Sequence, residues 1–276
     1  MPREVTAFSN STVKLLRSLR DKKGRRAEAL FLAEGLRILV EARDSGRLPE
    51  IIAFSAEGAK HPLAAEIIAA TEAAGGDAIE TTVDILSKMS GKDNPQMLLG
   101  VYRQPDMSLE RIDRGKADLW IVAQALRDPG NIGTILRTGD AVGAGGLILI
   151  DDSADPFSVE AVRASMGAVF TQEVVAARWP EFIGWLRPGE GQLVGTSLKA
   201  SDDYREAEYR KPCFLLIGNE QQGLPAEYEA ECDLLVKIPM AGRADSLNAA
   251  MASWSAPASR RRLIISERPT ASPAFS

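Results

Sequence analysis

The first hundred residues alternate short apolar runs with amphipathic segments, a pattern that predicts a small α/β unit. Val13, Leu16 and Leu19 recur at the spacing of one helical face, which predicts a helix over residues 11–19. Similar patterns, with glycines as terminators, predict further helices at 35–45, 62–74 and 83–89 and strands at 30–35, 51–54 and 97–102. Residues 104–116 are polar and have no clear period, so they are predicted to form a linker.

From residue 119 onward, continuous apolar strands alternate with helical segments. Strands are predicted at 119–123, 147–150, 173–175, 192–196, 213–218 and 234–238. Helices are predicted at 132–142, 159–169, 179–186, 224–230 and from Ser246 onward. Strands that are apolar along their whole length indicate a mostly parallel sheet with helices on both faces, so the predicted fold class is α/β. Ligands of such sheets bind beyond the carboxyl ends of the strands, here the loops after Ala123, Thr196, Gly218 and Ile238.

Length and composition are those of a globular protein with two domains. The chain has 276 residues, of which 45% are hydrophobic and 26% are charged. The predicted divisions are a first domain over 1–103, the linker over 104–116, a second domain over 117–265 and a tail over 266–276 that we expect to be disordered. No apolar run is long enough for a membrane span and the start lacks a signal-peptide core, so we expect a cytoplasmic protein.

The scarcity of histidine and cysteine excludes several classes of enzyme. One histidine, His61, and two separated cysteines do not provide the ligand spacing of an ordinary zinc site, so no metal is expected. A Ser–His–Asp triad would require His61, which instead precedes Pro62 at a predicted helix start. Cys213 and Cys232 lie in apolar segments and are predicted to be reduced core thiols. No G-x-G-x-x-G motif follows residues 119–123, which argues against a dinucleotide oxidoreductase.

Positive charge is concentrated at the start of the chain, although the net charge is −5. Residues 1–26 hold eight basic and two acidic residues, whereas the remainder holds 25 basic and 36 acidic ones. A basic arm on an acidic body suits phosphate binding, but a solvated amphipathic helix would give the same pattern. The candidate phosphate contacts, all within residues 11–26, are Arg17, Arg20, Lys22, Lys23, Arg25 and Arg26.

The loop after residues 119–123 carries the first set of candidate site residues. Pro129 starts a predicted turn, and Asn131 stands where a helix N-cap belongs. Gly133 has no Cβ, so another chain or a ligand can approach closely. Arg137, about one and a half turns further on, offers a planar guanidinium to a phosphate. A capped helix with a surface arginine is the alternative interpretation.

Two later loops also place polar residues at strand ends. After residues 213–218, Asn219 and Glu220 precede Gly223, and a glycine there permits positive φ and close approach of the backbone to a ligand. An ordinary strand-to-helix turn would look similar. In the loop after residues 234–238, Ser246 is a helix N-cap, and Asn248 follows just inside the helix, where its propensity is poor.

In their order and spacing, these three loops resemble the three motifs of the SpoU family of RNA ribose 2′-O-methyltransferases. The matching residues are Asn131, Gly133 and Arg137; then Gly218, Asn219, Glu220, Gly223 and Leu224; then Ile238, Pro239, Met240, Gly242, Ser246, Leu247 and Asn248. The resemblance implies transfer of a methyl group from S-adenosylmethionine (AdoMet) to a ribose 2′-hydroxyl. It also implies a homodimer whose catalytic domain contains a C-terminal trefoil knot.

The same resemblance assigns roles to individual residues. It implies that the catalytic residues are Arg137, Asn131, Glu220, Ser246 and Asn248. It implies cofactor binding by Thr196, Gly218, Ile238 and Leu247. Pro257 departs from the long apolar helix that the family usually has after the third motif, so a dimer-facing helix is expected to be shortened or kinked.

The first domain resembles, more loosely, the L30e-like substrate-binding domain of rRNA-modifying members of the family. The matching points are Glu34 with Gly35, and residues 94–96 before the last strand. This likeness favours 23S rRNA as the substrate. A tRNA ribose 2′-O-methyltransferase and a catalytically inactive RNA-binding relative are the alternatives.

Overall fold

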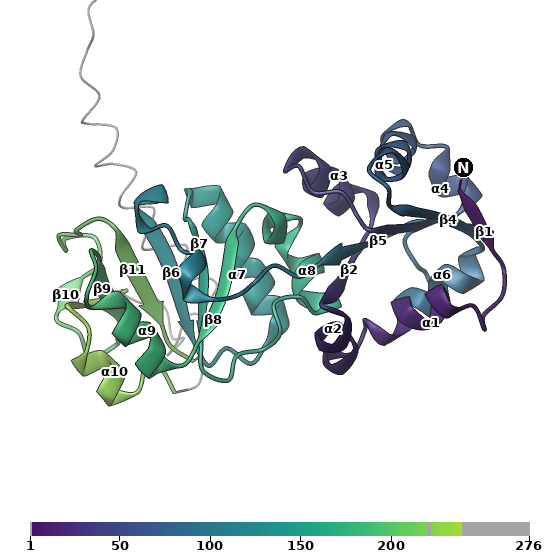
Figure 1. Cartoon of the computed structure of the whole chain (residues 1–276). Coiled ribbons are helices and arrows are strands. Elements are labelled where there is room, and N and C mark those ends of the chain that lie inside the picture. Colours follow the sequence, from purple (N-terminus) through teal and green to yellow (C-terminus); the bar gives the residue numbers. More distant parts are fainter. Residues whose placement is uncertain (1, 220–221, 239–276) are drawn as a thin grey trace, which may run out of the picture.

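The computed structural model describes residues 2–219 and 222–238, which form two α/β units joined by a docked segment (Figure 1). The elements of the first unit are β1 (Arg3–Val5), α1 (Ser11–Ser18), α2 (Lys22–Glu28), β2 (Leu30–Glu34), α3 (Leu36–Asp44), β3 (Ile51–Phe54), α4 (Ala56–Ala59), α5 (Pro62–Ala73), β4 (Asp77–Thr81), α6 (Val83–Ser90) and β5 (Leu98–Arg103). Its strands form a five-stranded sheet in the order β1-β4-β3-β5-β2. Helices α1 and α6 cover one face of this sheet and α3 and α5 cover the other (Figure 1).

The second unit is built on a parallel sheet. Its elements are β6 (Leu119–Gln124), α7 (Pro129–Val142), β7 (Gly146–Ile150), α8 (Val159–Ser165), η3 (Ala168–Phe170), β8 (Glu173–Ala177), α9 (Trp179–Leu186), β9 (Gln192–Thr196), β10 (Asp202–Asp203), β11 (Cys213–Ile217), α10 (Ala226–Ala230) and β12 (Leu234–Lys237). The strand order is β10-β12-β9-β11-β6-β7-β8, and every neighbouring pair is parallel. Residues of α7 and α8 pack on one face, where Ile121 and Leu215 lie, and α9 packs on the other against Trp120 and Phe214.

The strand order reverses beside β6. The chain adds β7 and β8 on one side of β6, then crosses to β9, and β11 afterwards pairs with both β6 and β9. In open α/β sheets, ligands bind at the carboxyl ends of the strands where the order reverses. The carboxyl ends of β6, β11, β9 and β12 are therefore the place to seek a site.

The predicted strands of the second unit agree closely with the observed ones, and the α/β fold class is confirmed. Residues 192–196 and 179–186 form their predicted elements with the predicted bounds. The helix predicted over 159–169 is shorter, because Met166 and Gly167 adopt left-handed φ values of 52° and 104° and the chain continues as η3. Four elements were not predicted in the first unit, namely β1, α2, α4 and β4.

Several smaller predictions can also be compared with the structure. The side chain of His61 accepts a hydrogen bond from the backbone N–H of Leu63 and caps α5. Cys213 is buried and Cys232 is half-buried, and burial raises the pKa of the Cys232 thiol to about 12. Among the described residues, no helix combines the length and apolar character that crossing a membrane requires. No group of three or more His, Cys, Asp or Glu residues within the described ranges is arranged to hold a metal ion.

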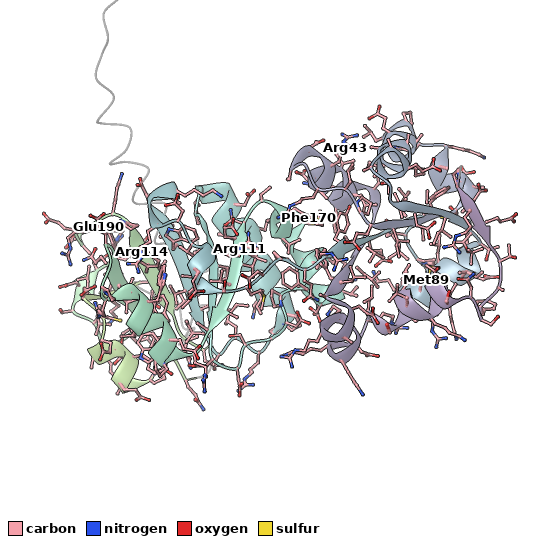
Figure 2. The ribbon with its side chains drawn as sticks, in the orientation of Figure 1. Arg43, Met89, Arg111, Arg114, Phe170 and Glu190 are labelled. Atoms are coloured by element: carbon pink, nitrogen blue, oxygen red, sulfur yellow. The ribbon has the colours of Figure 1, made fainter. Side chains whose placement is uncertain are left out.

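The segment predicted as a linker contains two short helices, η1 (Leu109–Arg111) and η2 (Arg114–Lys116), and is fastened to the second unit. Arg114 donates hydrogen bonds to the carbonyl oxygens of Trp185, Leu186 and Glu190, and its guanidinium lies 3.8 Å from the centre of the Trp185 ring (Figure 2). The carbonyls of Trp185 and Leu186 are at the C-terminal end of α9, where a positive charge is favourable. The predicted linker is thus ordered and packs along the second unit.

The two units share a core where β2 meets α8 and η3. The ring of Phe31 lies 5.0 Å from that of Phe157 and 5.8 Å from that of Phe170, measured between centroids. A Cβ on Gly167 would overlap the side chain of Glu41, so α3 also packs closely against the second unit. One apolar cluster therefore extends through both units.

Candidate active site and nucleic-acid interface

The loops after β6 and β11 meet at the carboxyl edge of the second sheet, and the end of β9 lies beside them. The side-chain amide of Asn219, after β11, donates to the carbonyl oxygen of Ala125, after β6, over 2.9 Å. The hydroxyl of Thr196 at the end of β9 donates to the carbonyl oxygen of Leu216 over 3.3 Å. Because β12 adjoins β9, the predicted cofactor-binding positions Thr196, Gly218 and Ile238 end neighbouring strands. Their role in binding a cofactor stays a prediction.

The two described ends of the loop after β11 lie close together. The N–H of Gly223 donates to the carbonyl oxygen of Asn219 over 2.8 Å, and Gly223 has a φ of +69°. A Cβ on Gly218 would overlap the backbone of Gly223 and the amide nitrogen of Leu224. The loop's own backbone therefore requires a glycine at position 218, whatever ligand lies beyond it.

The start of α7 differs from the prediction that Asn131 is the N-cap. The N-cap is Asp128, whose carboxylate accepts a hydrogen bond from the N–H of Gly130 over 2.7 Å, and Pro129 is the first helical residue. Asn131 thus lies in the first turn of α7, next to the carboxyl edge. Arg137 follows six residues later and is exposed. Helical side chains generally incline toward the helix N-terminus, which for Arg137 is the direction of that edge.

The backbone of α8 approaches Gly133 closely, so the space beside this glycine is filled by the same chain. A Cβ at Gly133 would overlap the carbonyl oxygen of Ala161 and the Cβ of Ala164, both on α8. The prediction that a ligand could use this space is therefore wrong for the described structure. Gly133 allows α7 and α8 to pack together.

Asp151, directly after β7, is a polar residue at the same edge that the sequence did not single out. Its carboxylate accepts hydrogen bonds from the N–H of Trp179 over 3.1 Å and from the hydroxyl of Tyr228 over 2.8 Å. Burial, together with the hydrogen bond to Asp151, raises the pKa of the Tyr228 phenol. Both oxygens of Asp151 are thus engaged in holding α9 and α10 to the end of β7.

Four predicted site residues lie outside the described residues. They are the predicted catalytic residues Glu220, Ser246 and Asn248 and the predicted cofactor-binding residue Leu247. The remaining predicted positions of the active site, Arg137 and Asn131 on α7 and the three strand-end residues, are within the described ranges.

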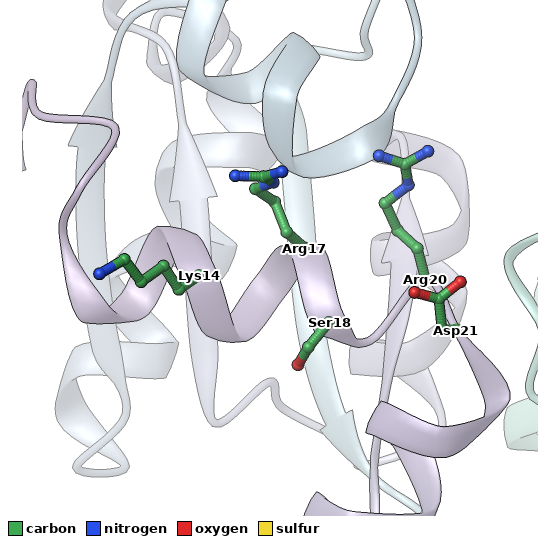
Figure 3. A pocket seen from close by; sticks show the side chains of 5 residues that line it. All are labelled: Lys14, Arg17, Ser18, Arg20 and Asp21. Carbon is green, nitrogen blue, oxygen red and sulfur yellow. The ribbon is translucent and has the colours of Figure 1, made fainter.

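The basic segment of the first unit forms an exposed surface, hereafter the α1–α2 surface. Lys14, Arg17 and Arg20, with Ser18 and Asp21, line a depression of about 360 Å³ (Figure 3). Figure 3 shows Arg17 and Arg20 extending toward the same side of the helix. The exposed basic side chains of α2 add further positive charge, and they are Lys22, Lys23 and Arg26. Lys14 was not among the predicted contacts, although its spacing of three residues from Arg17 places it on the same helical face.

Arg25 is the exception, and its prediction as a phosphate contact is wrong. The residue is 3% exposed. Its Nε and Nη2 donate to Oδ2 of Asp155 in the second unit, over 2.9 and 2.6 Å. Its Nη1 donates to the carbonyl oxygens of Leu19 and Arg20, over 2.9 and 2.7 Å. Four of the five N–H groups of the guanidinium are thus engaged within the protein, and burial keeps the side chain from a phosphate.

Two family models and several known proteins are similar to this chain. The SpoU rRNA Methylase family matches residues 118–254, and the MRM3-like substrate binding domain matches residues 10–100. The 23S rRNA (uridine(2479)-2′-O)-methyltransferase of Streptomyces viridochromogenes is 33% identical over 241 residues, covering 85% of this chain and 82% of the relative. The chain belongs to the SpoU rRNA methylase family. The resemblance drawn from the three loops is thereby confirmed.

Other SpoU relatives extend over nearly the whole chain. The 23S rRNA (guanosine(2553)-2′-O)-methyltransferase RlmP of Bacillus subtilis is 29% identical over 258 residues, 91% of this chain and 96% of the relative. The structure of an AdoMet-bound rRNA methyltransferase from Sinorhizobium meliloti is 40% identical and has a TM-score of 0.87, covering 95% of this chain and 98% of that one. The SpoU methyltransferase AviRb from Streptomyces viridochromogenes in complex with AdoMet has a TM-score of 0.81 at 29% identity, covering 94% and 100%.

Proposed function

We propose that this SpoU protein transfers a methyl group from AdoMet to the 2′-hydroxyl of a ribose in 23S rRNA. The observation that carries the proposal is the meeting of the loops after β6 and β11, beside which the first two motifs lie, at the carboxyl edge where the strand order reverses. The relatives named above support it, because two are 23S rRNA 2′-O-methyltransferases and two structures hold AdoMet.

The residues at the carboxyl edge fit AdoMet. Thr196, Gly218 and Ile238 end neighbouring strands and present apolar or small side chains beside main-chain polar groups, which suits a flat adenine ring. When bound, AdoMet supplies a methyl group on a positively charged sulfur. The chain itself must then position the ribose and stabilise the 2′-oxygen as its proton leaves.

Arg137 is the residue that we assign to this task. A protonated guanidinium can grip the phosphate next to the target ribose and stabilise negative charge on the 2′-oxygen. To act as the base instead, it would have to lose a proton that a guanidinium normally keeps. Asn131, one to two turns earlier on α7, would orient the ribose or Arg137. The family resemblance assigns the same orienting role to Glu220, Ser246 and Asn248.

The first unit favours rRNA over tRNA as the substrate. Its match to a substrate-binding domain supports a role in RNA capture, and the α1–α2 surface offers clustered cations for phosphates. We further propose a cytoplasmic homodimer. The proposal also includes the C-terminal trefoil knot that the family resemblance implies.

The direct test is to map ribose 2′-O-methylation in rRNA and tRNA from a strain in which the gene is deleted. We expect one 23S rRNA position to lose its methyl group and to regain it when the gene is restored. Restoration by a gene encoding Arg137→Ala serves as the control, and it should leave the position unmethylated. Loss of a tRNA methyl group would replace the proposed substrate, and an unchanged methylation map would contradict the proposed activity.

RNA capture by the α1–α2 surface can be measured separately. The variant Lys22→Ala/Lys23→Ala/Arg26→Ala should bind 23S rRNA fragments more weakly and with a flatter salt dependence, since each lost phosphate contact lowers the slope by about 0.7–0.9. AdoMet affinity should not change, because the cofactor positions are in the other unit.

A matched variant distinguishes this surface from general charge. Arg37→Ala/Arg43→Ala/Lys60→Ala removes the same charge near α3 and α5, across the first sheet from α1. We expect a salt titration of this control to follow the wild type. If α1 and α2 are a solvated basic face only, both triple variants will give the same affinity and slope.

A further inference from the structure

The depression on the α1–α2 surface is lined entirely by polar side chains that solvent reaches. It has a volume of about 360 Å³, and its lining residues are Lys14, Arg17, Ser18, Arg20 and Asp21. The three cations are exposed and form no ion pair with the residues that the structure describes, Asp21 included. Figure 3 shows Arg17 and Arg20 extending to the same side of α1. The depression thus offers uncompensated guanidinium and ammonium groups, which bind phosphate well.

Arg20 is held in position from two sides. Gly91, the C-cap of α6, has a φ of +74°, and a Cβ there would overlap the Arg20 guanidinium, so the arginine packs directly on this glycine. The main-chain carbonyl oxygen of Arg20 accepts a hydrogen bond from Nη1 of the buried Arg25 over 2.7 Å. Arg20 is therefore exposed yet ordered, and a group that is ordered in advance loses less conformational entropy when it binds a ligand.

The residue types in the depression favour the RNA backbone over unpaired bases as the ligand. None of the five lining residues is aromatic or aliphatic, whereas proteins that hold unpaired bases stack them mainly on aromatic side chains. Lys14 and Arg17 are separated by a helical rise of about 4.5 Å, and Arg20 follows just after α1 ends. Such a row of cations matches phosphates at regular spacing. A double helix presents its phosphates in that way, and proteins recognise double-stranded RNA mostly by its shape and backbone.

We propose that this depression binds the phosphate backbone of a double-helical segment of the RNA. Arg17 and Arg20 hold phosphates of one strand, and Lys14 extends the contact along that strand. The inference rests on the proposed function, because the rRNA substrate supplies the double helix, and it specifies the form of RNA that the first unit captures. Arg25 joins the main chain of Arg20 to Asp155 of the second unit, so the bound helix lies in a fixed position relative to the carboxyl edge of the second sheet.

The test compares an RNA hairpin that has a long uninterrupted stem with an oligouridine of the same length, which stays unpaired. Fluorescence anisotropy measures the binding of each labelled RNA to the full-length protein over a range of salt concentrations. We expect the hairpin to bind about tenfold more tightly, since a double helix has the higher density of phosphate charge. Arg17→Ala/Arg20→Ala should lose most of this preference and lower the salt slope by about 0.9 for each phosphate contact removed.

Arg37→Ala/Arg47→Ala is the matched control for charge. Arg37 lies on α3 and Arg47 lies in the loop after it, and both are exposed arginines that form no ion pair with the described residues. Neither of them lines the depression. This variant should keep the preference and the salt slope of the wild type. Equal losses in the two double variants would overturn the assignment, since general attraction between charges would explain both.

Gly91→Ala tests the position of Arg20 without changing any charge. The added methyl group displaces the guanidinium, so the affinity for the hairpin should fall about fivefold, roughly the loss of one hydrogen bond. Gly46→Ala is the matched control, because Gly46 has a φ of +75° and a Cβ there would meet no atom within 4 Å. Both variants place alanine at a positive φ and should lower the melting temperature similarly. An equal change of affinity in both would overturn the role given to the position of Arg20.

Two further results would overturn the proposal. One is equal or tighter binding of the oligouridine, the result expected of a site for unpaired RNA. The other is hairpin binding that Arg17→Ala/Arg20→Ala leaves unchanged. Transfer of methyl groups from AdoMet to rRNA is measured in parallel. Hairpin binding that depends on Arg17 and Arg20 without any methyl transfer would remove the proposed function and keep the double-helix site, and methyl transfer without that dependence would remove only the double-helix site.

Discussion

Arg137→Ala is expected to lower the rate of methyl transfer at least a hundredfold, with AdoMet affinity and melting temperature close to those of the wild type. Loss of one well-placed group that stabilises developing charge costs roughly 10²–10³ in rate. The fold should not suffer, because Arg137 is exposed and forms no ion pair within the described chain. Cofactor binding should persist because the proposed AdoMet positions lie on β9, β11 and β12, whereas Arg137 lies on α7.

Two companion variants make this result specific. Arg137→Lys should also be poor, since an ammonium is a point charge and cannot replace the planar fork of a guanidinium. Arg127→Ala should retain turnover, although it removes the same charge from an exposed residue just before α7. Single-turnover transfer from labelled AdoMet, with calorimetric AdoMet binding, measures both quantities. Near-normal turnover by Arg137→Ala would remove this residue from the proposed catalytic role.

The second unit could be predicted from sequence because its strands are apolar along their whole length. Such runs have few alternatives when helices alternate with them, and the parallel order then places the strand-end loops together. The first unit was harder, since β4 has the sequence Asp-Ala-Ile-Glu-Thr and pairs with β1 at the edge of the sheet. Only two of its five residues are strongly apolar, and strands of that composition resemble loops.

Helix α2 was missed for a different reason. Its sequence is highly charged and contains Gly24, which normally counts against a helix. In the structure, a Cβ at Gly24 would overlap the carbonyl oxygen of Ser18, so the glycine is needed for α2 to pack against the end of α1. The requirement for glycine at this position arises from tertiary packing, so nothing in the local sequence indicates a helix here. The start of α7, by contrast, could have been predicted, because proline favours the first helical position and Pro129 follows a capable N-cap, Asp128.

The misassignment of Arg25 shows the limit of charge patterning. Six cations in ten residues predict a basic surface, and five of the six side chains are exposed as that pattern requires. The partner of Arg25 is Asp155, 130 residues further along the chain, and no local rule connects the two. Composition therefore identified the α1–α2 surface but could not show which of its cations joins the two units.

Arg25→Ala is accordingly expected to destabilise the protein by about 3–5 kcal/mol, because it leaves the Asp155 carboxylate, 15% exposed, without its charged partner. The carbonyl oxygens of Leu19 and Arg20 lose their donor at the same time. For a chain of this length, such a loss corresponds to a fall of roughly ten degrees in melting temperature. Denaturant unfolding and thermal melts measure the two quantities, with Arg26→Ala, an exposed neighbour on α2, as the control that should change neither.

A double-mutant cycle assigns this loss to the pair. Asp155→Ala alone should destabilise by a similar amount, since it leaves a buried guanidinium unpaired, and Arg25→Ala/Asp155→Ala should be clearly more stable than the sum of the single variants predicts. Under conditions where Arg25→Ala remains folded, its RNA binding should have the salt slope of the wild type. Were Arg25 a phosphate contact after all, the opposite pattern would appear: an unchanged melting temperature and a salt slope lower by about 0.7–0.9. Arg25 thus holds the two units together through its ion pair. Its neighbours Lys22, Lys23 and Arg26 face solvent and are available to RNA.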